Sequence, residues 1–256
     1  HELDGETVRA VSESHTISEI LTASPRSALG LSQYHLGVWT RTFVQAEALL
    51  DQLRAGAASP EAVQAMFERL LRMAISRDER VLGLAAKYFD LEHMVAIGRR
   101  LLGTGLIGGK SVGMLLARAI LERADPRWQD RLEVHDSFFI PSDVFYTFLV
   151  RNGCWKIRKR QLKSKEYLEG AEEARQRILE GTFPEYIEKR FGDMLDYFGQ
   201  SPIIVRSSSL LEDNFGNSFA GKYDSVFCAN QGSRAERLEQ FLAAVKTVYA
   251  STMSKP

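Results

Sequence analysis

The sequence contains 256 residues, of which 45% are apolar, with 33 basic and 33 acidic side chains and no formal net charge at pH 7. This length suits one large domain or two small ones, and the balanced charge gives no electrostatic reason to expect a nucleic-acid or membrane partner. Only Cys154 and Cys228 are present, which excludes a disulfide framework or zinc pattern and predicts two buried thiols in a reducing compartment.

No stretch approaches the roughly 20 apolar residues of a membrane span, and no signal peptide is recognisable. We therefore expect a cytoplasmic protein. The chain begins with His1 rather than methionine and stops directly after a predicted helix, so we also expect it to be a fragment.

Residues 1–90 predict a helical module without a catalytic cluster. A short helix is expected near 17–21, and the apolar spacing over 32–55 is typical of an amphipathic helix. His35 and His93 are each isolated from other ligand-type residues, so a structural or exposed role is favoured for both.

A second helix is expected to start with Ser59 as its cap and Pro60 as its first residue. The polar residues at 76–79 predict a pause, after which the helical spacing continues over 81–88.

A glycine-rich stretch from Gly103 to Ser111 follows a segment with helical spacing over 91–102. Gly103, Gly105 and Gly108 satisfy the dinucleotide fingerprint G-x-G-x-x-G, which is informative only between a strand and a helix. Because a helix is predicted before it, a dinucleotide site is disfavoured.

The same stretch ends in Gly109-Lys110-Ser111, as a P-loop does. A P-loop also needs a glycine six residues before the lysine, where Thr104 stands, and its cradle of backbone N–H groups depends on that spacing. A P-loop nucleotidase further requires a strand before the loop, so a helix there would reject it.

Gly108, Gly109 and Lys110 open a predicted helix that has an apolar face and ends at Asp125-Pro126. A lysine beside a flexible turn at a helix start can reach a phosphate with help from the helix dipole. The alternative is a solvated lysine in a loop, which would be favoured if this motif stood by itself.

Four further elements are expected before residue 200: a strand over 137–140, a helix over 141–153, and amphipathic helices over 168–179 and 186–198. The basic residues of 156–165 could form a patch for an acidic partner. A solvated helix face is the favoured interpretation, because acidic residues follow at once.

The segment 203–224 concentrates the residues suited to chemistry. The apolar run 203–205 predicts a short buried strand, Arg206 stands at its end, and three serines and a loop with Gly216 and Gly221 follow. The fork of donors on an arginine, hydroxyls and glycines that allow close backbone approach suit an oxyanion ligand. A polar connection between two strands explains the composition equally well.

A strand is expected over 223–228, and Gly232 and Ser233 then begin the last helix. Helical spacing gives that helix a strong core face, formed by Leu238, Phe241, Leu242, Val245, Val248 and Tyr249.

The order of residues resembles the nucleotide-binding domain of the phosphoenolpyruvate synthase and pyruvate phosphate dikinase family. That family carries a segment close to V-R-S-S-A-T-A-E-D, then S-F-A-G-Q and an acid, and opens with a G-G-K motif whose lysine contacts ATP phosphates. The residues in register with the first motif are Val205, Arg206, Ser207, Ser208, Glu212, Asp213, Ser218, Phe219, Ala220, Gly221 and Asp224. Leu210 and Lys222 depart from the family, which has Thr and Gln there.

The resemblance covers about Gly108 to the C-terminus and implies an α+β fold. A helical N-terminal module over 1–90 would precede, over 91–256, the first half of an ATP-grasp-like domain with a small mixed sheet flanked by helices. The implied cofactors are ATP and Mg²⁺, with Arg206 and Lys110 as catalytic residues. The implied ATP-binding residues are Gly108, Gly109, Lys110, Arg206, Ser207, Ser208, Gly221, Lys222 and Asp224.

No metal ligand is assigned, although Asp213 and Asp224 could orient Arg206 or Lys222 or touch Mg²⁺. The resemblance implies an ATP-dependent phosphotransferase, a dikinase, that passes phosphate to a histidine on a separate domain and on to pyruvate or a related acceptor. Its expected partners are ATP and the C-terminal domains that carry the phosphohistidine and the acceptor site. His135 lies in no Thr-x-His segment and is not assigned that role.

We expect weak ATP binding and no turnover from this chain by itself. The alternative function is a non-catalytic regulatory or scaffold protein that senses nucleotide and binds a partner through its helical module.

Overall fold

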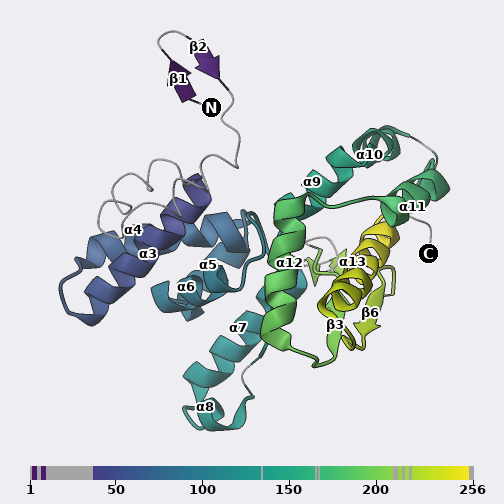
Figure 1. The fold of residues 1–256 in the computed structure, drawn as a ribbon. Coiled ribbons are helices and arrows are strands. Elements are labelled where there is room, and N and C mark those ends of the chain that lie inside the picture. The colour runs from purple at the N-terminus through teal and green to yellow at the C-terminus, as the bar shows by residue number, and fades with distance from the viewer. Residues whose placement is uncertain are drawn as a thin grey trace. The chain divides into compact units, whose positions relative to one another are not determined.

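A computed structural model describes the fold (Figure 1). The residues it describes are 2–4, 7–9, 37–133, 135–164, 166, 168–209, 213–214, 217–218 and 221–253. The chain divides into two compact units, residues 1–63 and 64–256, and each is described by itself. The expected helix near 17–21 lies outside the described residues.

The unit 1–63 combines a small hairpin with helix α3. Strand β1 (Glu2–Asp4) pairs antiparallel with β2 (Thr7–Arg9). Helix α3 spans Val38–Arg54 and buries Thr42, Ala46 and Leu50, which recur every four residues on one side. The helix predicted over 32–55 is therefore confirmed in its described part.

Helix α4 (Pro60–Leu70) begins at the predicted place, and the Ser59 hydroxyl accepts a hydrogen bond from the Ala62 N–H at 3.2 Å. It runs into a π-helical turn, η1 (Leu71–Ile75), which the spacing did not predict. The predicted pause follows at Ser76, and helices α5 (Glu79–Tyr88) and α6 (Leu91–Arg99) come next.

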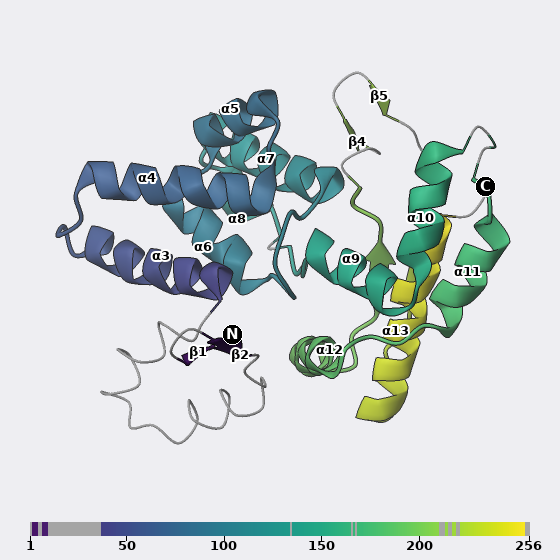
Figure 2. The ribbon, with the colours of Figure 1, turned by 90° about the horizontal axis from the view of Figure 1, so that it is seen from above.

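The unit 64–256 continues with helices at nearly all the predicted places. They are α7 (Gly109–Ala124), α8 (Trp128–Arg131), α9 (Ser142–Arg151), α10 (Cys154–Lys163), α11 (Ala171–Glu180) and α12 (Glu185–Phe198). Helix α10 carries most of the basic segment; it buries Cys154 and Ile157 and exposes Lys156, Lys159 and Lys163, as expected for a solvated helix face. Figure 2 shows α10 beside α9, against which it packs.

Strand β3 (Ile203–Arg206) pairs antiparallel with β6 (Ser225–Cys228), and β4 (Asp213–Asn214) pairs with β5 (Asn217–Ser218). The first pair is called the β3–β6 ribbon below. The predicted strand is confirmed, but its predicted burial holds only for alternate residues: Val205 is buried, whereas Ile204 is 43% exposed. The sheet is antiparallel where a small mixed sheet was expected.

The prediction of a strand over 137–140 was wrong. Phe139 makes one isolated parallel bridge with Leu101, and its neighbours carry no ladder. An apolar run becomes a strand only where a partner strand lies alongside, and that partner is not visible in the local pattern.

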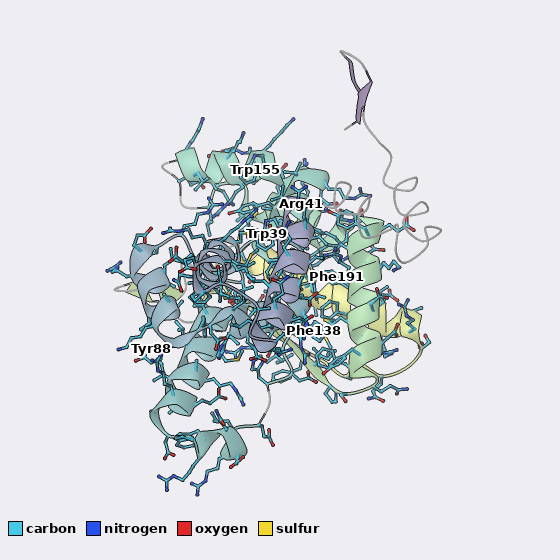
Figure 3. All side chains as sticks on the ribbon, turned by 90° about the vertical axis from the view of Figure 1, so that its left-hand side faces the viewer. Trp39, Arg41, Tyr88, Phe138, Trp155 and Phe191 are labelled. Atoms are coloured by element: carbon cyan, nitrogen blue, oxygen red, sulfur yellow. The ribbon has the colours of Figure 1, made fainter. Side chains whose placement is uncertain are left out.

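Helix α13 (Arg234–Ser251) organises the core of this unit. Ser233 and Glu236 form a capping box at its start. Its apolar side lies against β3, β6, α11 and α12 (Figure 1), and Phe148, Phe191, Leu195 and Phe241 belong to the same buried cluster. Figure 3 labels Phe191 on α12, whose ring meets that of Phe241 edge to face at 5.2 Å.

Helices around a small antiparallel sheet confirm the α+β class. Cys154 and Cys228 are both buried free thiols, as predicted, and burial raises the pKa of each. Across the described residues, no helix has the length and apolar character needed to span a bilayer.

Candidate nucleotide site

The loop before α7 is fastened to the first turn of α9. Thr104 donates from its backbone N–H and its hydroxyl to the two carboxylate oxygens of Asp143, at 2.8 and 2.6 Å. Leu106 exchanges hydrogen bonds with Ser142: its N–H donates to the serine hydroxyl at 3.2 Å, and its carbonyl accepts from the Ser142 N–H at 3.1 Å. These bonds, which bridge more than thirty residues of sequence, hold the loop that leads to the lysine motif.

The glycines of this loop are explained by that packing. A Cβ on Gly103 would lie 2.5 Å from the Val144 side chain, and one on Gly105, where φ is +105°, would lie 2.6 Å from the Ser142 hydroxyl. The segment before the loop is helix α6, followed by the single bridge at Leu101. A dinucleotide fingerprint and a P-loop both require a strand there, so both alternatives are rejected.

Gly108 brings the two sequence motifs together. It precedes α7 with φ +83°, and a Cβ on it would lie 1.4 Å from the carbonyl oxygen of Ser208. The Ser208 hydroxyl accepts a hydrogen bond from the Ser111 N–H at 3.0 Å and shares another with the Ser111 hydroxyl at 2.9 Å. Ser208 thus supplies, from 97 residues away, the cap that a glycine cannot give to the first turn of α7.

Lys110 and Arg206 flank this junction between Ser111 and Ser208. Lys110 is half-buried in the first turn of α7, next to Ser111, and Arg206 is exposed at the end of β3, two residues before Ser208. Because successive Cα atoms are about 3.8 Å apart, the Cα of Arg206 lies within about 7.6 Å of that of Ser208. The junction therefore brings the backbone positions of Lys110 and Arg206 near the first turn of α7.

The other predicted residues follow Arg206 directly or precede strand β6. Ser207 is buried, and Gly221 has φ +83° with open space where a Cβ would stand. Lys222 is half-buried, and Asp224 is exposed, with its backbone N–H donating to the Ser251 hydroxyl of α13 at 3.0 Å.

Part of the predicted motif lies outside the described residues, namely Glu212, Phe219 and Ala220. Asp213 and Ser218 are paired with each other through the β4–β5 register, and α7 packs against β4. The structure does not describe the side chain of Asp213, so its proposed roles stay predictions.

Three residues of the site were not assigned from the sequence: Thr104, Ser111 and Asp143. Ser111 appears in the sequence as the end of an incomplete P-loop pattern, and Asp143 as part of a helix start. Neither pattern contains a signal for its distant partner, because Ser208 and Thr104 are brought to them by the tertiary fold alone.

The described residues contain no group of three or more His, Cys, Asp or Glu side chains that could hold a metal ion. His135 is half-buried, with no hydrogen-bond partner for its Nδ1 among the described residues. Burial, and then the charges of Arg118 and Arg100, lower the pKa of His135, which favours the neutral ring. His93 instead pairs with Asp90 at 2.7 Å, a local structural role, and His35 lies outside the described residues.

Comparison with known proteins identifies the family of this region. Residues 104–256 match the family described as pyruvate phosphate dikinase, AMP/ATP-binding domain. Comparisons with curated proteins and with solved structures gave no significant match. The matched region holds both motifs and covers 153 of the 256 residues, counted from 104 to 256. The chain therefore belongs to the pyruvate phosphate dikinase family and contains its ATP-binding domain.

Proposed function

We propose that this chain is the ATP-binding part of a phosphotransferase similar to phosphoenolpyruvate synthase and pyruvate phosphate dikinase. The observation that supports the proposal is the junction of Ser208 with Gly108 and Ser111, because Lys110 precedes Ser111 and Arg206 stands two residues before Ser208. Two cations and a helix N-terminus at one point suit a polyphosphate.

In this proposal Arg206 and Lys110 bind different phosphates of ATP. Arg206 is exposed and has no ion pair with any described residue, so its planar fork can bind two phosphate oxygens at once. Lys110 neutralises a second phosphate as a compact charge. Phosphoryl transfer needs such positioning and charge neutralisation more than covalent chemistry from the protein.

The surrounding chain would close over the phosphates. Ser207 and Ser208 contribute hydroxyls, and Gly221 allows the backbone that carries Lys222 to approach the ligand closely. The backbone of Asp224 is held to α13 by the hydrogen bond to Ser251, and its exposed carboxylate would orient a neighbouring cation.

Magnesium would enter bound to the ATP phosphates and would neutralise part of their charge. The described side chains do not form a metal site of their own. The steps assigned to this chain therefore concern only its own side chains: binding and orienting the phosphates.

The remaining steps belong to the proposed partner domains. Phosphate from ATP would pass to a histidine on a separate domain and then to pyruvate or a related acceptor on another. The helical N-terminal residues would lie outside the ATP-grasp half, which we propose to span 91–256.

The binding step can be tested by calorimetry with Mg-ATP. We expect Arg206→Ala to weaken ATP binding about a hundredfold, the equivalent of nearly 3 kcal/mol, because a charge-assisted bidentate contact is lost. Arg131→Ala removes an equally exposed arginine from α8 and should leave the affinity unchanged. Equal affinities for wild type and Arg206→Ala would contradict the proposed site.

The transfer step needs the full-length protein and radiolabelled ATP. The proposal predicts acid-labile phosphate on the protein, absent in Lys110→Ala. ATP binding without any labelled protein would instead favour the non-catalytic nucleotide sensor.

A further inference from the structure

Helices α9 and α10 carry apolar side chains on the faces that they turn to solvent. Tyr146 is 49% exposed, Val150 62% and Leu162 69%. Residues four apart share one side of a helix, so Tyr146 and Val150 project from the same face of α9. Trp155 and Leu162, which are two turns apart, likewise share a face of α10. Each helix therefore has an apolar stripe that the core leaves at least partly open.

The two stripes meet at an aromatic contact. The rings of Tyr146 and Trp155 lie edge to face, with their centroids 5.7 Å apart. The ammonium of Lys159 lies 5.8 Å from the centre of the Trp155 ring, within reach of a cation–π interaction. Figure 3 labels Trp155, which belongs to α10. The tertiary fold thus places a second aromatic ring, from α9, beside the basic segment.

Lysines border these apolar side chains. The ten residues of α10 include five basic and no acidic side chains. Arg160 pairs with Glu173 at 3.1 Å, whereas the exposed lysines of α10 form no ion pair with any residue that the structure describes. A solvated face explains these lysines but not the contiguous apolar side chains among them. The α9–α10 patch consists of Tyr146, Val150, Trp155, Lys156, Lys159, Leu162 and Lys163.

We propose that the α9–α10 patch binds an acidic amphipathic helix of a partner protein. The apolar side chains of that helix pack on Tyr146, Trp155 and Leu162, and its carboxylates pair with the lysines at the border. Protein interfaces commonly have aromatic side chains at the centre and charges at the rim. Opposite charge steers the partner to the patch, and α10, about 15 Å long, offers nearly three turns of contact. This inference does not depend on the proposed ATP site.

Nucleic acid and anionic membranes are also attracted to lysines. Helix α11 packs beside α10, and Glu172 in its first turn and Glu166 in the preceding segment are exposed. A duplex or a bilayer extends beyond α10 and would bring its own anions against these carboxylates. A single short helix can lie along α10 without covering α11. Its apolar side chains also match Tyr146, Val150 and Leu162, which a phosphate backbone does not, so the acidic helix is favoured.

The test uses a fluorescently labelled peptide with leucine at helical spacing and glutamate elsewhere, and fluorescence anisotropy measures its binding to the protein. We expect a dissociation constant in the micromolar range. Leu162→Asp removes an apolar contact and adds a like charge, so it should weaken binding at least about tenfold. Combined Lys159→Glu and Lys163→Glu should weaken binding about tenfold at low salt and less at high salt.

Two matched variants lie outside the patch. Phe227→Ala removes a side chain that is 81% exposed on the β3–β6 ribbon, and Arg131→Glu reverses an exposed charge on α8. Neither should change the affinity for the peptide. Leu162→Asp should keep the wild-type midpoint of urea unfolding, because Leu162 is exposed, and this separates a lost contact from a lost fold.

Trp155 supplies a readout within the patch. Burial of its ring under the peptide should move its fluorescence emission to shorter wavelengths. Trp155→Phe keeps an aromatic ring, so it should bind the peptide within about threefold of wild type and lose this emission change. Trp39 and Trp128 remain as the background in both proteins.

Each contrary outcome rejects the proposed partner helix. No binding of the peptide, or equal binding by wild type and Leu162→Asp, would show that the patch is not its site. Tighter binding of duplex RNA or of phosphatidylserine vesicles, lost in the double charge reversal, would show that the patch binds a polyanion instead. A dimer that sediments in the wild type and is dissolved by Leu162→Asp would identify a second copy of the chain as the occupant.

Discussion

The two faces of the β3–β6 ribbon are built from alternate residues of the same short strands and have opposite roles. The inner face, with Ile203, Val205, Val226 and Cys228, joins the core around α13. The outer face holds Ile204, Arg206, Ser225 and Phe227, all exposed. Position in the pleat, rather than residue type, decides which side chains stabilise the fold and which are available to a ligand.

The largest effect is expected at Gly108, where the segment that follows β3 meets the start of α7. Gly108→Ala places a Cβ against the Ser208 carbonyl at a φ of +83°, so we expect it to lower the free energy of unfolding by about 3 kcal/mol. It should also abolish ATP binding, because Ser208 would lose its hydrogen bonds to Ser111 in the first turn of α7. Urea unfolding and calorimetry measure the two effects.

Gly113 provides the control on the same helix. A Cβ there meets no atom within 4 Å, so Gly113→Ala should raise the free energy of unfolding by about 0.5–1 kcal/mol. Similar destabilisation by both substitutions would contradict the close approach of Ser208 to Gly108.

The next prediction compares neighbouring residues on opposite faces. Val205→Ala should lower the free energy of unfolding by about 2 kcal/mol, because it opens a cavity against α13, whereas Ile204→Ala should cost less than about 1 kcal/mol. Thermal and urea unfolding of the two variants measure the difference. Equal costs would mean that both faces are buried in solution.

Rates of thiol labelling test the same difference between the inner and outer faces of the ribbon. Cys228 is buried and its pKa is raised by that burial, whereas a thiol introduced by Phe227→Cys would point to solvent. We expect the new thiol to react at least about tenfold faster with a disulfide reagent than Cys228 does, since thiolate content and access set the rate. Comparable rates would show that the register assigned to β6 is wrong.

The helices could be predicted from the sequence more fully than the site could. The spacing of apolar residues in α7 and the Ser233–Glu236 signal before α13 are local, and both helices formed at the expected residues. The strand expected over 137–140 failed because a ladder depends on a partner elsewhere in the chain, and only Phe139 found one.

The site residues likewise divide into those predictable from local sequence and those that depend on distant partners. Lys110 and Arg206 could be chosen because their motifs resemble those of a known family. The contacts that unite them, Ser111 with Ser208 and Thr104 with Asp143, join residues 97 and 39 positions apart and leave no pattern in a single sequence. The exposure of Phe227 likewise depends on its register with Ile204.

The smallest effect is expected from a histidine away from the ribbon. The hydrogen bond that His93 donates to the Asp90 carboxylate raises the pKa of His93, with Glu122 and Glu92 adding to the effect and burial opposing it. Its stabilising contribution is therefore complete below the unfolded pKa of about 6.5 and is lost as pH rises through the folded pKa. Because the side chain is 39% exposed, we expect less than about 1 kcal/mol.

Urea unfolding of wild type and His93→Gln between pH 5.5 and pH 8 measures this effect, and the difference should shrink as pH rises. His135, whose pKa is lowered mainly by burial, has the opposite sign: its contribution is lost as pH falls below about 6.5. His135→Gln is therefore the matched comparison. A difference for His93→Gln that grows with pH would contradict the Asp90 pairing.

The most direct test of the central claim is an NMR titration of this chain with Mg-ATP, repeated with Arg206→Ala. If the two motifs form one phosphate site, the amide signals of Lys110 and Ser111 will shift together with those of Arg206 and Gly221, with one dissociation constant. These shifts will be lost in Arg206→Ala. Shifts confined to one motif, or unchanged in the variant, would contradict a shared site.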